Sequence, residues 1–194
     1  MIQELSHKVA RWMEQEGVIS NGDNELFAYA VYSLLFGLLP AFIAALLGLV
    51  FGMLWEGLLM ITPFILIRKF SGGYHFGSSK LCIIFSTALL SFSMGFIQVI
   101  VHKGYTMLLT VLVSLAALWI CTFSPVDNSA RKLTKAEQKR FRKIARVLAI
   151  ASIAAYLIMC KTISVPYSAS FGVGVLLAAM LQVPCIISRI RISR

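Results

Sequence analysis

The residues between Arg68 and Cys82 have the types and the spacing that most clearly suggest chemistry. They form a short polar stretch between two long apolar blocks, and this stretch holds His75, one of only three histidines. A thiolate is a strong nucleophile, and a neighbouring imidazole can act as its general base and then as a general acid. The stretch therefore predicts a His–Cys pair. The alternative is a small apolar cysteine in a membrane helix beside an exposed loop imidazole.

The position of Cys82 relative to a helix start matters for this chemistry. With Ser79 as N-cap, the sulfur lies in the first turn, where unpaired amides and the positive end of the helix favour a thiolate. His75 lies seven residues upstream, about 10.5 Å away along a continuous helix, which is too far for a hydrogen bond. The pair can work only if the chain folds back. Three glycines, which tolerate positive φ, allow such a path: Gly72, Gly73 and Gly77.

Composition places this pair in an integral membrane protein. Of 194 residues, 59% are hydrophobic and only 13% charged, which is too little charge to cover a soluble domain of this length. The net charge of +10 then indicates topology and lipid head groups, and not nucleic acid. The four cysteines stand singly, without the spacing of a disulfide framework or a zinc site. No metal or cofactor is implied.

The apolar blocks predict an all-α polytopic membrane protein with six transmembrane helices in one domain, 1–194. A span needs roughly 20 apolar residues, so the block from Leu26 to Ile67 holds two helices joined by a tight turn. The predicted spans are 26–46, 49–67, 81–101, 105–123, 144–164 and 167–188.

The basic residues orient the bundle. With the N-terminus inside, every lysine and arginine except Lys103 and Lys161 falls in an inner segment, as the positive-inside rule requires. Both termini and the loop 68–80 are then cytoplasmic, where a thiol stays reduced. Residues 1–24 contain an amphipathic helix with Trp12 on its apolar face, ending near Gly17. This is typical of an interfacial helix. Packing on the protein's own cytoplasmic loops is the alternative.

The segment 124–143 is the one long polar connection. Its second half is strongly basic, and Thr134 to Glu137 resembles a capping box that opens a helix running into the fifth span. Orientation and contact with anionic membrane lipids are enough to explain the charge, at ~1 kcal/mol for each base near the surface.

The pattern Arg68-x3-Gly72-Gly73-x-His75-x6-Cys82 resembles the signature of the accessory gene regulator B (AgrB) family. The N-terminal segment, the six predicted spans and an inner loop opening with Ser124-Pro125-Val126-Asp127-Asn128 extend the resemblance over the whole chain. It implies a multi-pass cysteine endopeptidase of the bacterial cell membrane that processes an AgrD-like quorum-sensing propeptide on the cytoplasmic side. It also implies a homodimer.

By that resemblance, Cys82 is the nucleophile and His75 its base. The family cuts its propeptide on the C-terminal side of the future signal peptide and forms an acyl-enzyme thioester. An internal cysteine or serine of the peptide then displaces the enzyme and closes a thiolactone or lactone ring. A stabilised thiolate suits these steps because it is both a nucleophile and a leaving group. The propeptide's C-terminal part is typically acidic in this family, so the basic loop could dock it.

Four further residues have two interpretations each. Asp127 could orient the His75 ring, or be a solvated loop carboxylate or helix cap. Arg68 could bind a substrate carboxylate or carbonyl, or anchor the end of the second span. Gly72 and Gly73 could offer amides to an oxyanion, or serve only as a turn.

A small transporter or exporter without covalent chemistry is the rival function. It predicts polar residues paired between spans. The spans offer Glu56, Gln98 and Gln182, without an evident pairing or an internal repeat.

Overall fold

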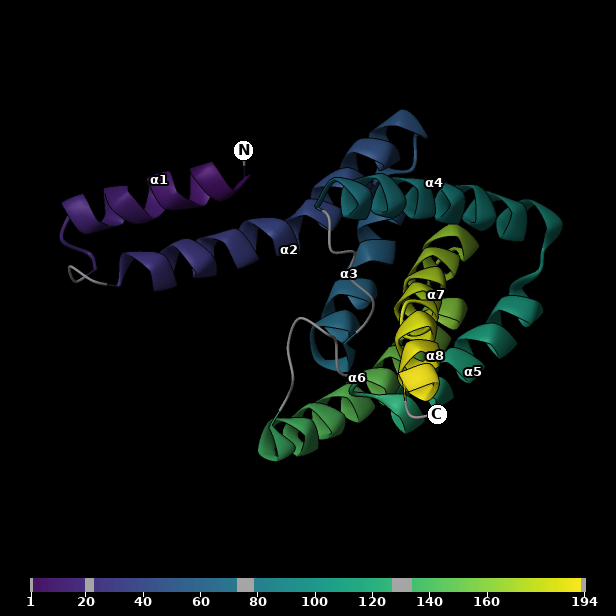
Figure 1. The fold of residues 1–194 in the computed structure, drawn as a ribbon. Coiled ribbons are helices and arrows are strands. Elements are labelled where there is room, and N and C mark those ends of the chain that lie inside the picture. The colour runs from purple at the N-terminus through teal and green to yellow at the C-terminus, as the bar shows by residue number, and fades with distance from the viewer. Residues whose placement is uncertain (1, 20–22, 73–78, 127–133, 193–194) are drawn as a thin grey trace. The chain divides into compact units, whose positions relative to one another are not determined.

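The computed structural model describes residues 2–19, 23–72, 79–126 and 134–192, and these ranges are almost entirely helical (Figure 1). In chain order the helices are α1 Ile2–Gln15, α2 Asn24–Val50, α3 Leu54–Ser71, α4 Ser79–Lys103, α5 Thr106–Phe123, α6 Lys135–Thr162, α7 Val165–Met180 and α8 Val183–Ile192. Within the described ranges the β-type pairing is a single bridge between Gly72 and Val126. The all-α prediction is confirmed.

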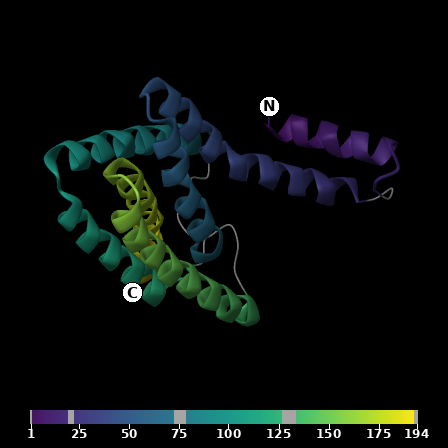
Figure 2. The same cartoon turned by 180° about the vertical axis from the view of Figure 1, so that it is seen from behind.

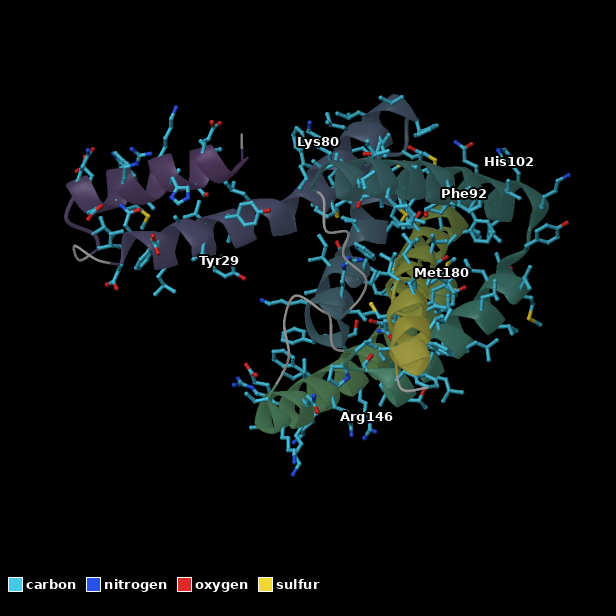
Figure 3. All side chains as sticks on the ribbon, in the orientation of Figure 1. Tyr29, Lys80, Phe92, His102, Arg146 and Met180 are labelled. Carbon is cyan, nitrogen blue, oxygen red and sulfur yellow. The ribbon has the colours of Figure 1, made fainter. Side chains whose placement is uncertain are left out.

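Within the part of the chain that the structure describes, five helical segments are long and apolar enough to cross a membrane: α2, α4, α5, α6, and α7 continued into α8 as Val165–Ile187. Many of their large apolar side chains are exposed, Phe92 and Met180 (labelled in Figure 3) among them, as lipid contact requires. The predicted second span corresponds to α3, which is not among the five. It has 18 residues, with Glu56 in its first turn and Arg68 and Lys69 in its last.

The turn between α2 and α3 lies later than the sequence predicted. α2 continues to Val50 because Gly52, at φ 67°, closes it. The amide of Met53 donates to Gly48 O at 2.7 Å, and that of Gly52 donates to Leu49 O at 3.3 Å. These two bonds form a Schellman motif, in which a left-handed glycine satisfies the last carbonyls of a helix.

The chain divides into two compact units, 1–42 and 43–194. In the first, α1 lies beside the beginning of α2 (Figures 1 and 2). Asn24 donates a hydrogen bond to the Glu14 carboxylate, and the small residues Ser6, Ala10 and Ala28 are buried. The apolar Trp12 remains 59% exposed. α1 ends at Gln15, just before Gly17, as the sequence predicted.

In the second unit, α7 is the central element and packs against α3, α4, α5 and α6 (Figure 1). Its small residues permit close approach. A Cβ atom at Gly174 would lie 2.0 Å from Met60 O of α3, and one at Gly172 would lie 2.7 Å from the Tyr156 ring of α6. The Tyr156 hydroxyl also hydrogen-bonds Thr110 of α5, at 3.1 Å. Interfaces between membrane helices favour small residues for this reason.

The last predicted span, 167–188, is broken. α7 ends at Met180, and α8 begins at Val183. Pro184 lacks the N–H that would continue the helical ladder. Before the fifth span, Thr134 and Glu137 form the predicted capping box, with Glu137 N donating to Thr134 Oγ1 at 3.3 Å. One helix, α6, therefore runs from the basic segment into the span.

Candidate active site

The C-terminal end of α3 is joined to the segment that follows α5. The amide of Val126 donates to Ser71 O at 2.9 Å, which creates the parallel bridge between Gly72 and Val126. The amide of Gly72 donates back to Arg68 O at 3.2 Å. Ser71 and Val126 are both buried. We call this pairing of residues 71–72 with 124–126 the α3–α5 junction.

Only glycine fits at position 72 of the junction. Its backbone has φ 78° and ψ −170°, a region that other residues avoid. A Cβ atom there would lie 2.2 Å from Val126 O, far inside van der Waals contact. The sequence predicted a backbone requirement at Gly72 but not the partner strand that imposes it.

The α5 side of the junction is held by the start of α8. Ser124 caps α5, with its amide bonded to Ile120 O at 3.1 Å, and the Ser124–Pro125 peptide bond is cis. The hydroxyl oxygen of Ser124 accepts a hydrogen bond from Nε2 of Gln182 at 3.1 Å. Gln182 is fully buried and directly precedes the first residue of α8.

Cys82 lies in the first turn of α4, two residues after Lys80, which is labelled in Figure 3. The predicted helix start is confirmed to within a residue. The thiol is free and half-exposed. The first four amides of a helix have no partner within it, and they attract negative charge. The position is therefore suited to a thiolate nucleophile.

Arg68 brings a positive charge from α3 to this position. Its guanidinium stacks over the Phe64 ring at 5.4 Å. Electrostatic interaction couples the Arg68 guanidinium to the Cys82 and Cys185 sulfurs. The guanidinium is therefore within electrostatic reach of both sulfurs, and it stays protonated at neutral pH, as arginine does in proteins.

The basic start of α6 lies beside the same end of α3. The rings of Phe70 and Phe141 meet edge to face, with centroids 5.8 Å apart. Arg146, labelled in Figure 3, donates through Nε to Cys121 O near the end of α5 at 3.1 Å. Four further cations around Phe141 are exposed on α6: Lys139, Arg140, Arg142 and Lys143.

The predicted site residues fall into two groups. Arg68, Gly72 and Cys82 are described, and Arg68 lies within electrostatic reach of the Cys82 thiol. His75, Gly73 and Asp127 lie outside the described residues, although Asp127 follows Val126 directly in the sequence. Among the residues that are described, no group of three or more histidine, cysteine, aspartate or glutamate side chains could hold a metal ion.

Sequence reasoning missed three residues that support the site. Ser124 entered only as the first residue of the inner-loop pattern, and Cys185 gave no signal of its own. Gln182 was noted as a polar residue in an apolar segment, but only as a possible element of a transport path. Its bond to Ser124 could not be read from the sequence.

Comparison with known proteins gives one family. The model of the family described as accessory gene regulator B matches residues 6–186. Two proteins of Clostridium perfringens named as AgrB-like, from strain 13 and strain SM101, are each 26% identical over 155 residues. Each match covers 74% of this chain and 70% of the relative. No solved structure matches.

Proposed function

Because the chain belongs to the accessory gene regulator B family, which acts in agr quorum sensing, we propose that it is a membrane-embedded cysteine endopeptidase. Its substrate is an AgrD-like propeptide, from which it releases a cyclic signalling peptide. The observation that carries this proposal is the position of Cys82 in the first turn of α4, within electrostatic reach of the Arg68 guanidinium. This electrostatic interaction links the end of α3 to the start of α4, and His75 lies between these two helix ends in the sequence.

In the proposed reaction, His75 accepts the Cys82 proton and the thiolate attacks the scissile carbonyl. The C–N bond breaks, His75 returns the proton to the leaving amine, and a thioester to Cys82 remains. An internal thiol or hydroxyl of the peptide then gives its proton to His75, attacks the thioester and expels the Cys82 thiolate. This step closes a thiolactone or lactone ring without net hydrolysis.

The supporting residues take distinct parts in this proposal. Arg68 stabilises negative charge at the reacting centre, on the thiolate or on the oxygen of the tetrahedral intermediate. Gly72 has the turn role, because its amide already donates to Arg68 O and is not free for an oxyanion. Gly73 offers an amide to the oxyanion, and Asp127 orients the His75 ring.

We further propose six spans with both termini in the cytoplasm. In addition to the five segments named above, α3 crosses the membrane as the second span in chain order. α3 packs along α7, and its charges are confined to its first and last turns, from which long side chains can reach the interface. On this topology the site and the basic start of α6 share the cytoplasmic face of the cell membrane. That basic start then docks the acidic part of the propeptide and also meets anionic lipids. α1 lies in the membrane interface, and the protein is a homodimer.

The test is mass spectrometry on membranes that contain the protein and its propeptide. We expect a propeptide fragment joined to Cys82 as a thioester, and loss of cleavage in Cys82→Ser and His75→Ala at unchanged protein levels. Cys160→Ser is the matched control, because this thiol is exposed at the end of α6 remote from the junction. Cleavage that survives in Cys82→Ser would refute the catalytic assignment and leave the transporter alternative.

A further inference from the structure

Gln182 is an unusual residue for its position. It is 0% exposed in a segment that is otherwise apolar, and only one end of its amide is satisfied. Nε2 donates to Ser124, whereas Oε1 has no hydrogen-bond partner among the described residues. A buried carbonyl without a partner costs free energy. The amide is therefore a poor choice for stability alone, which points to a role in function.

The bond from Gln182 reaches the junction through a short series of contacts. Ser124, which accepts the bond, is followed by the buried Pro125 and Val126. Val126 pairs with Ser71 through its amide, at 2.9 Å, and its carbonyl faces Gly72. A displacement of Ser124 therefore moves the backbone against which the end of α3 is fixed.

The first turn of α8 supports the site on a second side. Cys185 lies three residues after Gln182, in the first turn of α8, and is buried. The Arg68 guanidinium is within electrostatic reach of the Cys185 sulfur as well as the Cys82 sulfur. The start of α8 thus interacts with both α3, through Arg68, and the end of α5, through Ser124.

We propose that Gln182 is a positioning residue for the peptidase reaction: its hydrogen bond to Ser124 fixes the α3–α5 junction, and the junction fixes the reactive geometry at Cys82. This inference rests on the proposed function. It assigns no contact between Gln182 and the substrate. It predicts that the amide contributes to the reactivity of Cys82 and not to the stability of the fold.

The experiment uses the full chain in detergent and the probe iodoacetamide, with alkylation at Cys82 quantified by peptide mass spectrometry from pH 5 to 9. In Gln182→Met, which keeps the side-chain length and removes the orphaned carbonyl, we expect an unchanged or higher Tm. We also expect faster hydrogen exchange at the Val126 amide, and alkylation of Cys82 about tenfold slower at pH 7 with its pH profile moved upward. Ser124→Ala should also show the faster Val126 exchange and the slower Cys82 alkylation. Ser124→Thr, which keeps the hydroxyl, should return both measurements to wild-type values.

Gln98→Met is the matched control, because Gln98 is exposed on α4 and bonds Met53 Sδ, at 3.3 Å. The inference is overturned if Gln182→Met leaves the Val126 exchange or the Cys82 profile at wild-type values, or if it lowers Tm without changing that profile. Failure of the proposed function has a different signature. In that case His75→Ala alkylates like the wild type, while the exchange measurement still reports on the junction.

Discussion

Replacing Gly72 with alanine tests whether the α3–α5 junction governs the site. The new Cβ would lie 2.2 Å from Val126 O, whereas ordinary contact begins near 3.4 Å. The two segments of the junction must therefore separate by about 1 Å or more. Backbone strain at φ 78° costs about 1–3 kcal/mol. Losing the bond from Val126 to Ser71 costs about 0.5–1.5 kcal/mol. The two costs do not simply add, because breaking the bond from Val126 to Ser71 relieves part of the strain. We therefore expect the free energy of unfolding to fall by about 2 kcal/mol.

The effect on activity should exceed the effect on stability. A misplacement of about 1 Å can reduce a rate about 100-fold, and we expect propeptide cleavage by Gly72→Ala to fall by that order. A net loss of about 2 kcal/mol lowers Tm by about 4–8 °C for a chain of this size. Cleavage is measured in membranes with protein levels matched, and Tm in detergent.

Two other glycines provide controls that distinguish the effect of backbone strain from the effect of steric contact. Gly104 has φ 69°, but a methyl group added to it would have no atom of the described residues within 4 Å, and Gly95 has equally open surroundings among those residues without a positive φ. Gly104→Ala should therefore lower Tm while cleavage persists, and Gly95→Ala should leave both unchanged or raise Tm slightly. Wild-type cleavage by Gly72→Ala would refute the reasoning, because the junction would then not control the site.

Three further predictions concern other contacts. Arg68→Gln should slow iodoacetamide alkylation of Cys82 at pH 7 about tenfold, and Arg68→Lys should retain part of the rate; equal rates in all three proteins would exclude an electrostatic role. Gly174→Ala should lower the free energy of unfolding by about 1–3 kcal/mol, because its methyl would lie 2.0 Å from Met60 O; an unchanged Tm would contradict the close packing of α3 on α7. Thr134→Ala should destabilise the start of α6 by about 0.5–2 kcal/mol, detected as faster hydrogen exchange over 135–138, and unchanged exchange would argue against the capping box.

The sequence predicted what depends on local composition. Continuous apolar runs identified the helices, and the pattern from Thr134 to Glu137 identified the start of α6. The α2–α3 turn was misplaced because the apolar run continues through it, and only the geometry at Gly52 sets where α2 ends. Pro184 predicted a kink in the last span, and the structure has a full break there, with α7 ending at Met180 and α8 beginning at Val183.

The site could be predicted only where it lies on one helix. Cys82 at the start of α4 follows from the serines before it. The Gly72–Val126 bridge joins segments far apart in the sequence, and no periodic pattern encodes such a pairing. The same holds for the bond between Gln182 and Ser124. Long-range backbone pairing depends on how α7 sets the spacing of α3 and α5, which hydropathy does not reveal.

The helix ends at the site are fixed because their buried backbone groups have few alternative partners. Backbone groups that are removed from water need partners within the protein. The last carbonyls of α3 receive the amides of Gly72 and Val126, and Cys121 O of α5 receives Nε of Arg146. Val126 follows α5 and bonds a carbonyl of α3, and Arg146 of α6 bonds a carbonyl of α5. Satisfying the helix ends therefore also assembles the junction. The same bonds that make burial tolerable therefore hold Arg68 where its charge can act on Cys82.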